Sequence, residues 1–151
     1  HEDLKYWLFK CGGEATLNSY SSQKKFYEHI EYLKSLPHYI EYKDYKTLDN
    51  RYLVVSHSTV GKMWNLRNST NKDDVEEFNE FVNWSRWKNH DNEDIFNVYG
   101  HTIFQEPLLN DYSCGIDLGC FYKNKEKLAN PRLCALEFPS MKIYTQESLE
   151  N

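Results

Sequence analysis

Residues 52–57 read YLVVSH, an apolar and partly β-branched run that ends in a histidine. This pattern predicts a short buried β-strand with His57 at its carboxyl end. Residues 95–101 read IFNVYGH and repeat the arrangement, because a second predicted strand ends in Gly100 and His101. Sheets in α/β proteins commonly bind ligands at the carboxyl ends of their strands. We therefore expect two neighbouring strands that each bring one imidazole to a shared site.

Helix and strand patterns on both sides of this pair predict a mixed α/β fold rather than a doubly wound nucleotide-binding fold. Apolar residues at three- and four-residue spacing predict helices, of which one ends at Gly12 and Gly13 and another runs from a Ser22 cap to Pro37. Alternating apolar and polar residues predict a hairpin that includes the first strand. The predicted helices cover residues 1–11, 22–36 and 72–87, and the predicted strands cover residues 38–45, 52–55, 95–99, 112–118, 133–138 and 141–144.

The composition favours one soluble domain over residues 1–151. The chain is 40% hydrophobic, 16% aromatic and 27% charged, which is enough apolar material for one core. A formal net charge of -5 argues against nucleic acid as the main partner, since such proteins usually carry a basic face. No apolar run approaches the ~20 residues needed to span a bilayer, so we expect no membrane partner.

The cysteines predict free thiols rather than a metal or disulfide framework. Four are present, and none forms the closely spaced pair that structural zinc usually requires. Without a secretory signal, we expect buried free thiols and a cytoplasmic location. The cysteines are Cys11, Cys114, Cys120 and Cys134.

His57 and His101 are candidate metal ligands. Neutral imidazole is the commonest nitrogen ligand for transition metals, and a strand end holds the ring rigidly beside a cleft. Gly100 would let the backbone approach such a site closely or adopt a tight turn. The alternative for each histidine is a structural role in which the ring is simply hydrogen-bonded.

Arg86 is a candidate anion-binding residue. It lies between Trp84 and Trp87, which could anchor the segment while the guanidinium binds a phosphate or carboxylate with two parallel donors. The alternative is a surface cation–π pair with one of the tryptophans. Asp117, between two apolar residues, could equally take part in chemistry or accept hydrogen bonds from the backbone.

Taken together and in their order along the chain, the segments of this sequence resemble the C-terminal portion of the calcineurin-like metallophosphoesterases, specifically the bacterial and phage serine/threonine phosphoprotein phosphatases. Residues 1–4, HEDL, are similar to the end of the family's Gly-Asn-His-Glu motif, and residues 53–57, LVVSH, to its strand with a metal-binding histidine. Residues 84–86, WSR, are similar to its Trp-x-Arg segment, residues 99–102, YGHT, to its Gly-His-Thr motif, and residues 116–120, IDLGC, to its Ile-Asp-Thr-Gly strand. The similarity extends along essentially the whole chain.

The resemblance implies a metal-dependent phosphomonoester hydrolase with a β-sandwich flanked by helices. It implies two divalent metal ions (Mn, Fe or Zn), of which His57 and His101 bind one, and it assigns Arg86 to the substrate phosphate. His1 would be the general acid that protonates the leaving alkoxide. The expected substrate is a phosphorylated protein or a small phosphoester.

The family's Asp-x-His and Gly-Asp-x-x-Asp-Arg-Gly motifs, which supply the other metal ligands, do not occur in the sequence. Since the chain begins at His1 rather than Met, we expect an N-terminal half of the domain upstream, and catalysis only when that half is joined or docked. Strands left without their partners would give the isolated chain a tendency to self-associate. The alternative function is a non-catalytic binding or assembly module that keeps the phosphatase scaffold.

Overall fold

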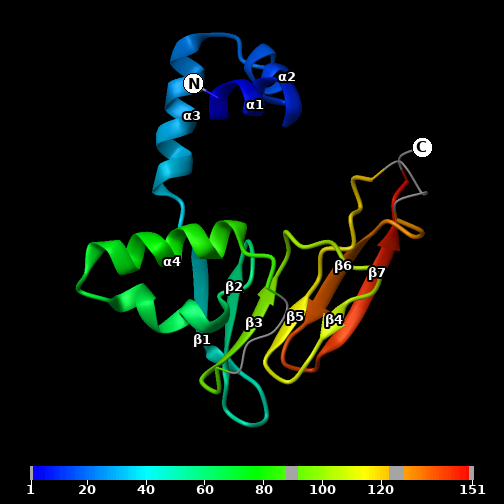
Figure 1. Ribbon diagram of the computed structural model, residues 1–151. Helices are drawn as coiled ribbons and strands as arrows, with labels where there is room; N and C mark the ends of the chain where they lie inside the picture. The colour runs from blue at the N-terminus through cyan, green and yellow to red at the C-terminus, as the bar shows by residue number, and fades with distance from the viewer. Residues whose placement is uncertain (1, 88–91, 123–127, 150–151) are drawn as a thin grey trace. The chain divides into compact units, whose positions relative to one another are not determined.

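The computed structural model describes residues 2–87, 92–122 and 128–149. The chain divides into two compact units, His1–Pro37 and His38–Asn151 (Figure 1). Each unit has its own elements, and the prediction of a single domain stays a prediction. In the described ranges, no helix is both long enough and apolar enough to cross a bilayer.

The first unit is helical, as its apolar spacing predicts. Gly12 adopts a left-handed backbone (φ 78°) just after the first helix, and the Ser22 hydroxyl accepts a hydrogen bond from the Lys25 N–H at 3.3 Å to begin the third. Leu36 is extended, because the following proline disfavours a helical conformation there. The short second helix was not predicted. The helices are α1 (Glu2–Lys10), α2 (Gly13–Asn18) and α3 (Gln23–Ser35).

The second unit contains a five-stranded mixed sheet in the order β1-β2-β3-β5-β4 and a separate β6-β7 hairpin. Strands β2, β3 and β5 are parallel, and the two edge strands run antiparallel to their neighbours. The mixed α/β class is confirmed. The strands are β1 (Tyr39–Lys46), β2 (Tyr52–Ser56), β3 (Ile95–Tyr99), β4 (Leu108–Leu109), β5 (Ser113–Gly115), β6 (Arg132–Glu137) and β7 (Lys142–Glu147), and the helices are η1 (Gly61–Asn68, a 3-10 helix) and α4 (Lys72–Trp84).

Two helices cover one face of the sheet (Figure 1). Trp64 of η1 and Phe78 and Val82 of α4 pack against Val54 and Ile95 of the central strands, and all five are essentially inaccessible to water. This core fixes α4 across the sheet. The position of the helix end, and of the residues that follow it, is therefore set by a large apolar contact.

The opposite face carries a second, smaller core. Phe96 and Val98 of β3 and Cys114 of β5 are buried there, with Leu136 and Phe138 from the hairpin side packed against them. Because successive residues of a strand point to opposite faces, β3 supplies both cores. All five of its residues are buried, which explains its near-continuous apolar sequence.

Several boundaries differ from the predictions, and helix η1 and the short strand β4 were not predicted. The helix predicted to residue 87 ends at Trp84, because Ser85 is extended (φ -64°, ψ 137°). The strand predicted over residues 112–118 is regular only over Ser113–Gly115. Helix η1 was missed because its eight residues have no clear apolar periodicity, although it buries Trp64.

Candidate active site

His57 and His101 meet at the carboxyl edge of the sheet. Strands β2 and β3 are parallel neighbours with Ser56 opposite Tyr99, so both strands end at the same level of the sheet. The Gly100 N–H donates to the His57 carbonyl at 3.0 Å and extends this pairing by one step. The expected convergence is found, since His57 Nε2 lies 3.0 Å from His101 Nδ1 and the ring centroids are 4.8 Å apart.

The turn between β3 and the second imidazole is made by the histidine itself. His101 has a φ of 63°, in the left-handed region that non-glycine residues rarely adopt. The Thr102 N–H donates to the Gly100 carbonyl at 2.7 Å and closes the turn. Gly100 is not left-handed, and a Cβ there would make only ordinary contacts at 3.6 Å or more, so the close approach that a glycine permits is not found at this position.

The surroundings of His101 lower the pKa of its ring. Burial lowers its pKa, and the neighbouring His57 ring and Arg86 guanidinium lower it further, while Asp117 and a hydrogen bond to the backbone of Trp84 act in the opposite direction. The net shift is downward, which favours the form that retains a free lone pair. Ligating histidines commonly have their second ring nitrogen fixed by such a backbone hydrogen bond.

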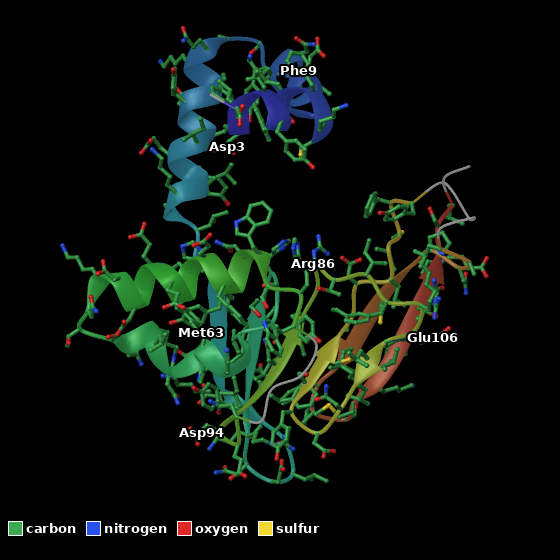
Figure 2. All side chains as sticks on the ribbon, in the orientation of Figure 1. Asp3, Phe9, Met63, Arg86, Asp94 and Glu106 are labelled. Carbon is green, nitrogen blue, oxygen red and sulfur yellow. The ribbon has the colours of Figure 1, made fainter. Side chains whose placement is uncertain are left out.

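Arg86 lies beside this pair, two residues after the end of α4. Figure 2 labels it at the edge where β3 ends, and labels Asp94 at the opposite edge where β3 begins. Its Nη1 is 3.5 Å from the His101 carbonyl oxygen, and the side chain is exposed. Lys62 lies over Trp87, at 5.4 Å from the ring centroid, and no cation–π pair of Arg86 with either tryptophan is found in the part of the chain that the structure describes.

Two further residues build the site, namely Trp84, which the sequence indicated only as an anchor for Arg86, and Ser58, which was not singled out. Trp84 contacts His101 edge to face, with ring centroids 5.9 Å apart and planes at 84°. Ser58 is fully buried, and its hydroxyl bonds to the end of α4. The signal available for Trp84 was a tryptophan at the end of an amphipathic helix. Ser58 gave no such signal, because its role depends on a hydrogen bond to Val82, 24 residues further along the chain.

Asp117 lies close to the turn but is held by the backbone. Its Oδ1 accepts a hydrogen bond from the Gly119 N–H at 2.9 Å, and its own carbonyl accepts one from Phe104 at 2.9 Å. Of the two alternatives for Asp117, acceptance of a hydrogen bond from the backbone is found, and a part in chemistry stays a prediction. Its Cβ lies 3.6 Å from where a Cβ of Gly100 would stand, so the carboxylate also contributes negative charge near His101.

The two imidazoles fit part of the coordination shell of one metal ion. Two nitrogens that bind one ion at about 2.0–2.1 Å and at about 90–110° to each other lie about 2.8–3.4 Å apart. The observed 3.0 Å separation is within this range, and it is also the length of a hydrogen bond between the two rings, so the structural alternative stated for each histidine fits the same distance. Within residues 2–87, 92–122 and 128–149, however, no group of three His, Cys, Asp or Glu side chains could hold a metal. A metal ion bound by this pair would need its further ligands from outside these residues.

The remaining predicted residues are placed as follows. His1, the expected general acid, lies outside the described residues. All four cysteines are free, but only Cys114 is fully buried and Cys11 is exposed, so the expectation of buried thiols is wrong for Cys11.

The sequence matches no protein-family model, and a comparison with curated proteins also gives no match.

Proposed function

We propose that this chain is part of a metal-dependent phosphomonoester hydrolase, of the cytoplasmic serine/threonine protein phosphatase kind. The observation that supports the proposal best is the pair His57 and His101, whose nitrogens lie 3.0 Å apart with Arg86 beside them. The unfavourable backbone of His101 adds support, because left-handed non-glycine residues cluster at functional sites.

In this proposal, His57 and His101 bind one of two divalent ions (Mn, Fe or Zn). The other ligands belong to the N-terminal half that the resemblance places upstream of His1. Bound metal would supply Lewis-acid stabilisation of phosphoryl charge and would lower the pKa of a water molecule. Burial of His101 and its contact with Trp84 keep the ring neutral and oriented for that role.

Arg86 binds the substrate phosphate. Its planar guanidinium can donate two parallel hydrogen bonds to phosphate oxygens, and it never loses its charge near neutral pH. Because Nη1 is 3.5 Å from the His101 carbonyl oxygen, a phosphate held by Arg86 lies next to the imidazoles. His1 is proposed to donate the proton that the leaving alkoxide requires.

Metal titration with matched histidine variants tests the metal site. Calorimetry with Mn²⁺ or Zn²⁺ is expected to give binding to the wild-type chain that falls at least about tenfold in His57→Ala and in His101→Ala. His38→Ala is the control, because His38 is an exposed histidine bonded to Asn83 rather than to this pair. Equal metal affinity in all four proteins would contradict the assignment.

Activity is tested on the chain joined or mixed with its upstream segment. Hydrolysis of an aryl phosphate should be abolished in His101→Ala, while Arg86→Ala should raise KM for the phosphoester more than it lowers kcat. A fully active His101→Ala protein would overturn the proposal.

A non-catalytic binding module is the second candidate. It is favoured by the donor count, since the described residues bring together two imidazoles but no third ligand. In that case neither metal binding nor hydrolysis would appear, even with the upstream segment present.

A further inference from the structure

A cavity of about 350 Å³ adjoins the candidate active site and shares Arg86 with it, while its other lining residues have no role in the chemistry proposed above. It lies at the C-terminal end of α4 and the segment that follows, within the second unit. Its walls combine acidic, aromatic and basic side chains. The main lining residues are Glu77, Glu80, Phe81, Trp84, Arg86 and Trp87.

The helical repeat explains how this lining arises. Glu77, Glu80, Phe81 and Trp84 are spaced at i, i+3, i+4 and i+7, which places them on one face of α4. Phe81 is partly buried and forms the inner wall, whereas Trp84 is 71% exposed. An indole this exposed at the edge of a cavity offers a large apolar surface to a ligand.

The cavity is continuous with the histidine pair. Trp84 lines the cavity and also contacts the His101 ring, at a centroid distance of 5.9 Å. Arg86 lines the cavity and has its Nη1 3.5 Å from the His101 carbonyl oxygen. A molecule whose phosphate is bound by Arg86 therefore has its remaining part directed along the wall that these residues form.

The two ends of the cavity carry opposite charge. Arg86 is at the end next to the imidazoles, and Glu77 and Glu80 are further back along α4. Both carboxylates are exposed, and neither has an ion-pair partner within residues 2–87, 92–122 and 128–149. Lys62 already covers Trp87, which leaves the ring of Trp84 as the aromatic surface next to these carboxylates.

We propose that this cavity binds an arginine or lysine side chain of a phosphorylated peptide substrate, and so makes the site selective for phosphoserine or phosphothreonine near a basic residue. The proposal rests on the phosphatase function given above. Carboxylates attract the cation and the exposed indole packs on its aliphatic stem or guanidinium plane. Arg86 at the other end repels a basic residue that stands directly beside the phosphorylated one.

The spacing of the helix sets the spacing in the peptide. With a rise of 1.5 Å per residue, Glu80 and Glu77 lie about 6 and about 10 Å along α4 from Trp84. An extended peptide advances about 3.3 Å per residue, so the basic residue is expected about two to three positions from the phosphorylated one. A small ammonium phosphate such as choline phosphate holds its charges only a few bonds apart and cannot reach both ends.

The experiment measures binding of four labelled peptides to the chain by fluorescence anisotropy. The peptides carry either phosphoserine or serine, combined with either arginine or glutamine three residues away. In the wild-type chain, arginine in place of glutamine is expected to tighten binding about tenfold. Glu77→Gln with Glu80→Gln should reduce this ratio to about twofold or less, whereas Glu93→Gln with Glu147→Gln, the matched control for charge, should leave it unchanged.

The design separates this inference from the proposed function. If the phosphate makes no difference and Arg86→Ala has no effect, while arginine still tightens binding through Glu77 and Glu80, the phosphatase proposal fails and the cation site stands. An arginine-to-glutamine ratio near one, or a ratio that survives the Glu77→Gln/Glu80→Gln change, overturns the cation site. Peptide binding too weak to measure at millimolar concentration overturns it as well, as does choline phosphate competing through the same carboxylates.

Discussion

The Ser58 hydroxyl accepts a hydrogen bond from the Ser85 N–H at 3.1 Å. It also donates to the Val82 carbonyl at 2.7 Å, and the Ser58 N–H donates to the same carbonyl at 2.9 Å. One fully buried side chain thus ties the loop after β2 to the end of α4. Since Ser58 follows His57 and Ser85 precedes Arg86, this contact holds the backbone before Arg86 next to the backbone after His57.

Ser58→Ala is expected to weaken the site more than the fold. The Ser85 N–H still donates to the Phe81 carbonyl at 2.8 Å, and the Val82 carbonyl still accepts from the backbone, so no buried group loses every partner. We expect a loss of about 1 kcal/mol in the free energy of unfolding, measured by urea denaturation. Affinity for a phosphopeptide should fall several-fold as Arg86 becomes mobile, and should not change in Ser140→Ala, whose hydroxyl lies in the β6-β7 turn. A loss above about 3 kcal/mol would show that Ser58 is chiefly a folding residue.

Asn97→Ala is expected to lower the free energy of unfolding more than Ser58→Ala does, because the Asn97 side chain accepts a hydrogen bond from the Val60 N–H, which has no other acceptor in the part of the chain that the structure describes. Its Oδ1 accepts from the Val60 N–H at 3.0 Å, and its Nδ2 donates to the Val54 carbonyl and the Ser56 hydroxyl at 3.2 and 2.9 Å. The residue is completely buried. Removal leaves the Val60 N–H unpaired in the core and should cost about 2–3 kcal/mol in urea denaturation. A cost within 0.5 kcal/mol of wild type, roughly the range of surface changes, would contradict this role.

The sequence was sufficient for the parts of this site that depend on local patterns. The strands before His57 and His101 could be predicted because β-branched and aromatic runs are a local signal, and their ends place the imidazoles. The cap at Ser22 and the break before Pro37 have the same local origin.

Contacts between distant segments could not be predicted. Nothing near Ser58 indicates that its hydroxyl bonds to residues 82 and 85, and nothing near Trp84 indicates that its ring contacts His101. The left-handed backbone of His101 could not be predicted either, because glycine is the usual residue for this conformation and the chain uses a histidine. Such positions depend on packing between elements that are far apart in sequence.

Two glycine substitutions provide a matched test of the turn and the sheet. Gly100→Ala adds a Cβ whose nearest neighbours lie at 3.6 Å, so the free energy of unfolding and metal affinity should stay within about 0.5 kcal/mol of wild type. Gly115→Ala places a Cβ 2.4 Å from Cε2 of Phe104, which must move, at a cost of about 1–3 kcal/mol. Urea denaturation of both variants checks the difference, and a Gly100→Ala protein as unstable as Gly115→Ala would show that the turn does need a glycine.

Cys114 links stability to alkaline pH. Burial raises the pKa of its thiol to about 11, with a smaller contribution from Cys134. Between the usual thiol pKa and about 11, the unfolded chain releases this proton while the folded chain keeps it. The free energy of unfolding should therefore fall as the pH rises through that window, whereas below the window this thiol makes no pH-dependent difference to it. Urea denaturation at pH 7.5 and pH 10.5 should show a decline that is smaller in Cys114→Ala, after allowance for its lower stability at pH 7.5.

At pH 8 the folded chain should also react rapidly with a thiol reagent at the exposed Cys11, whereas Cys114 should react only on unfolding. Equal reactivity of the two thiols in the folded chain would mean that the core around Cys114 opens to solvent.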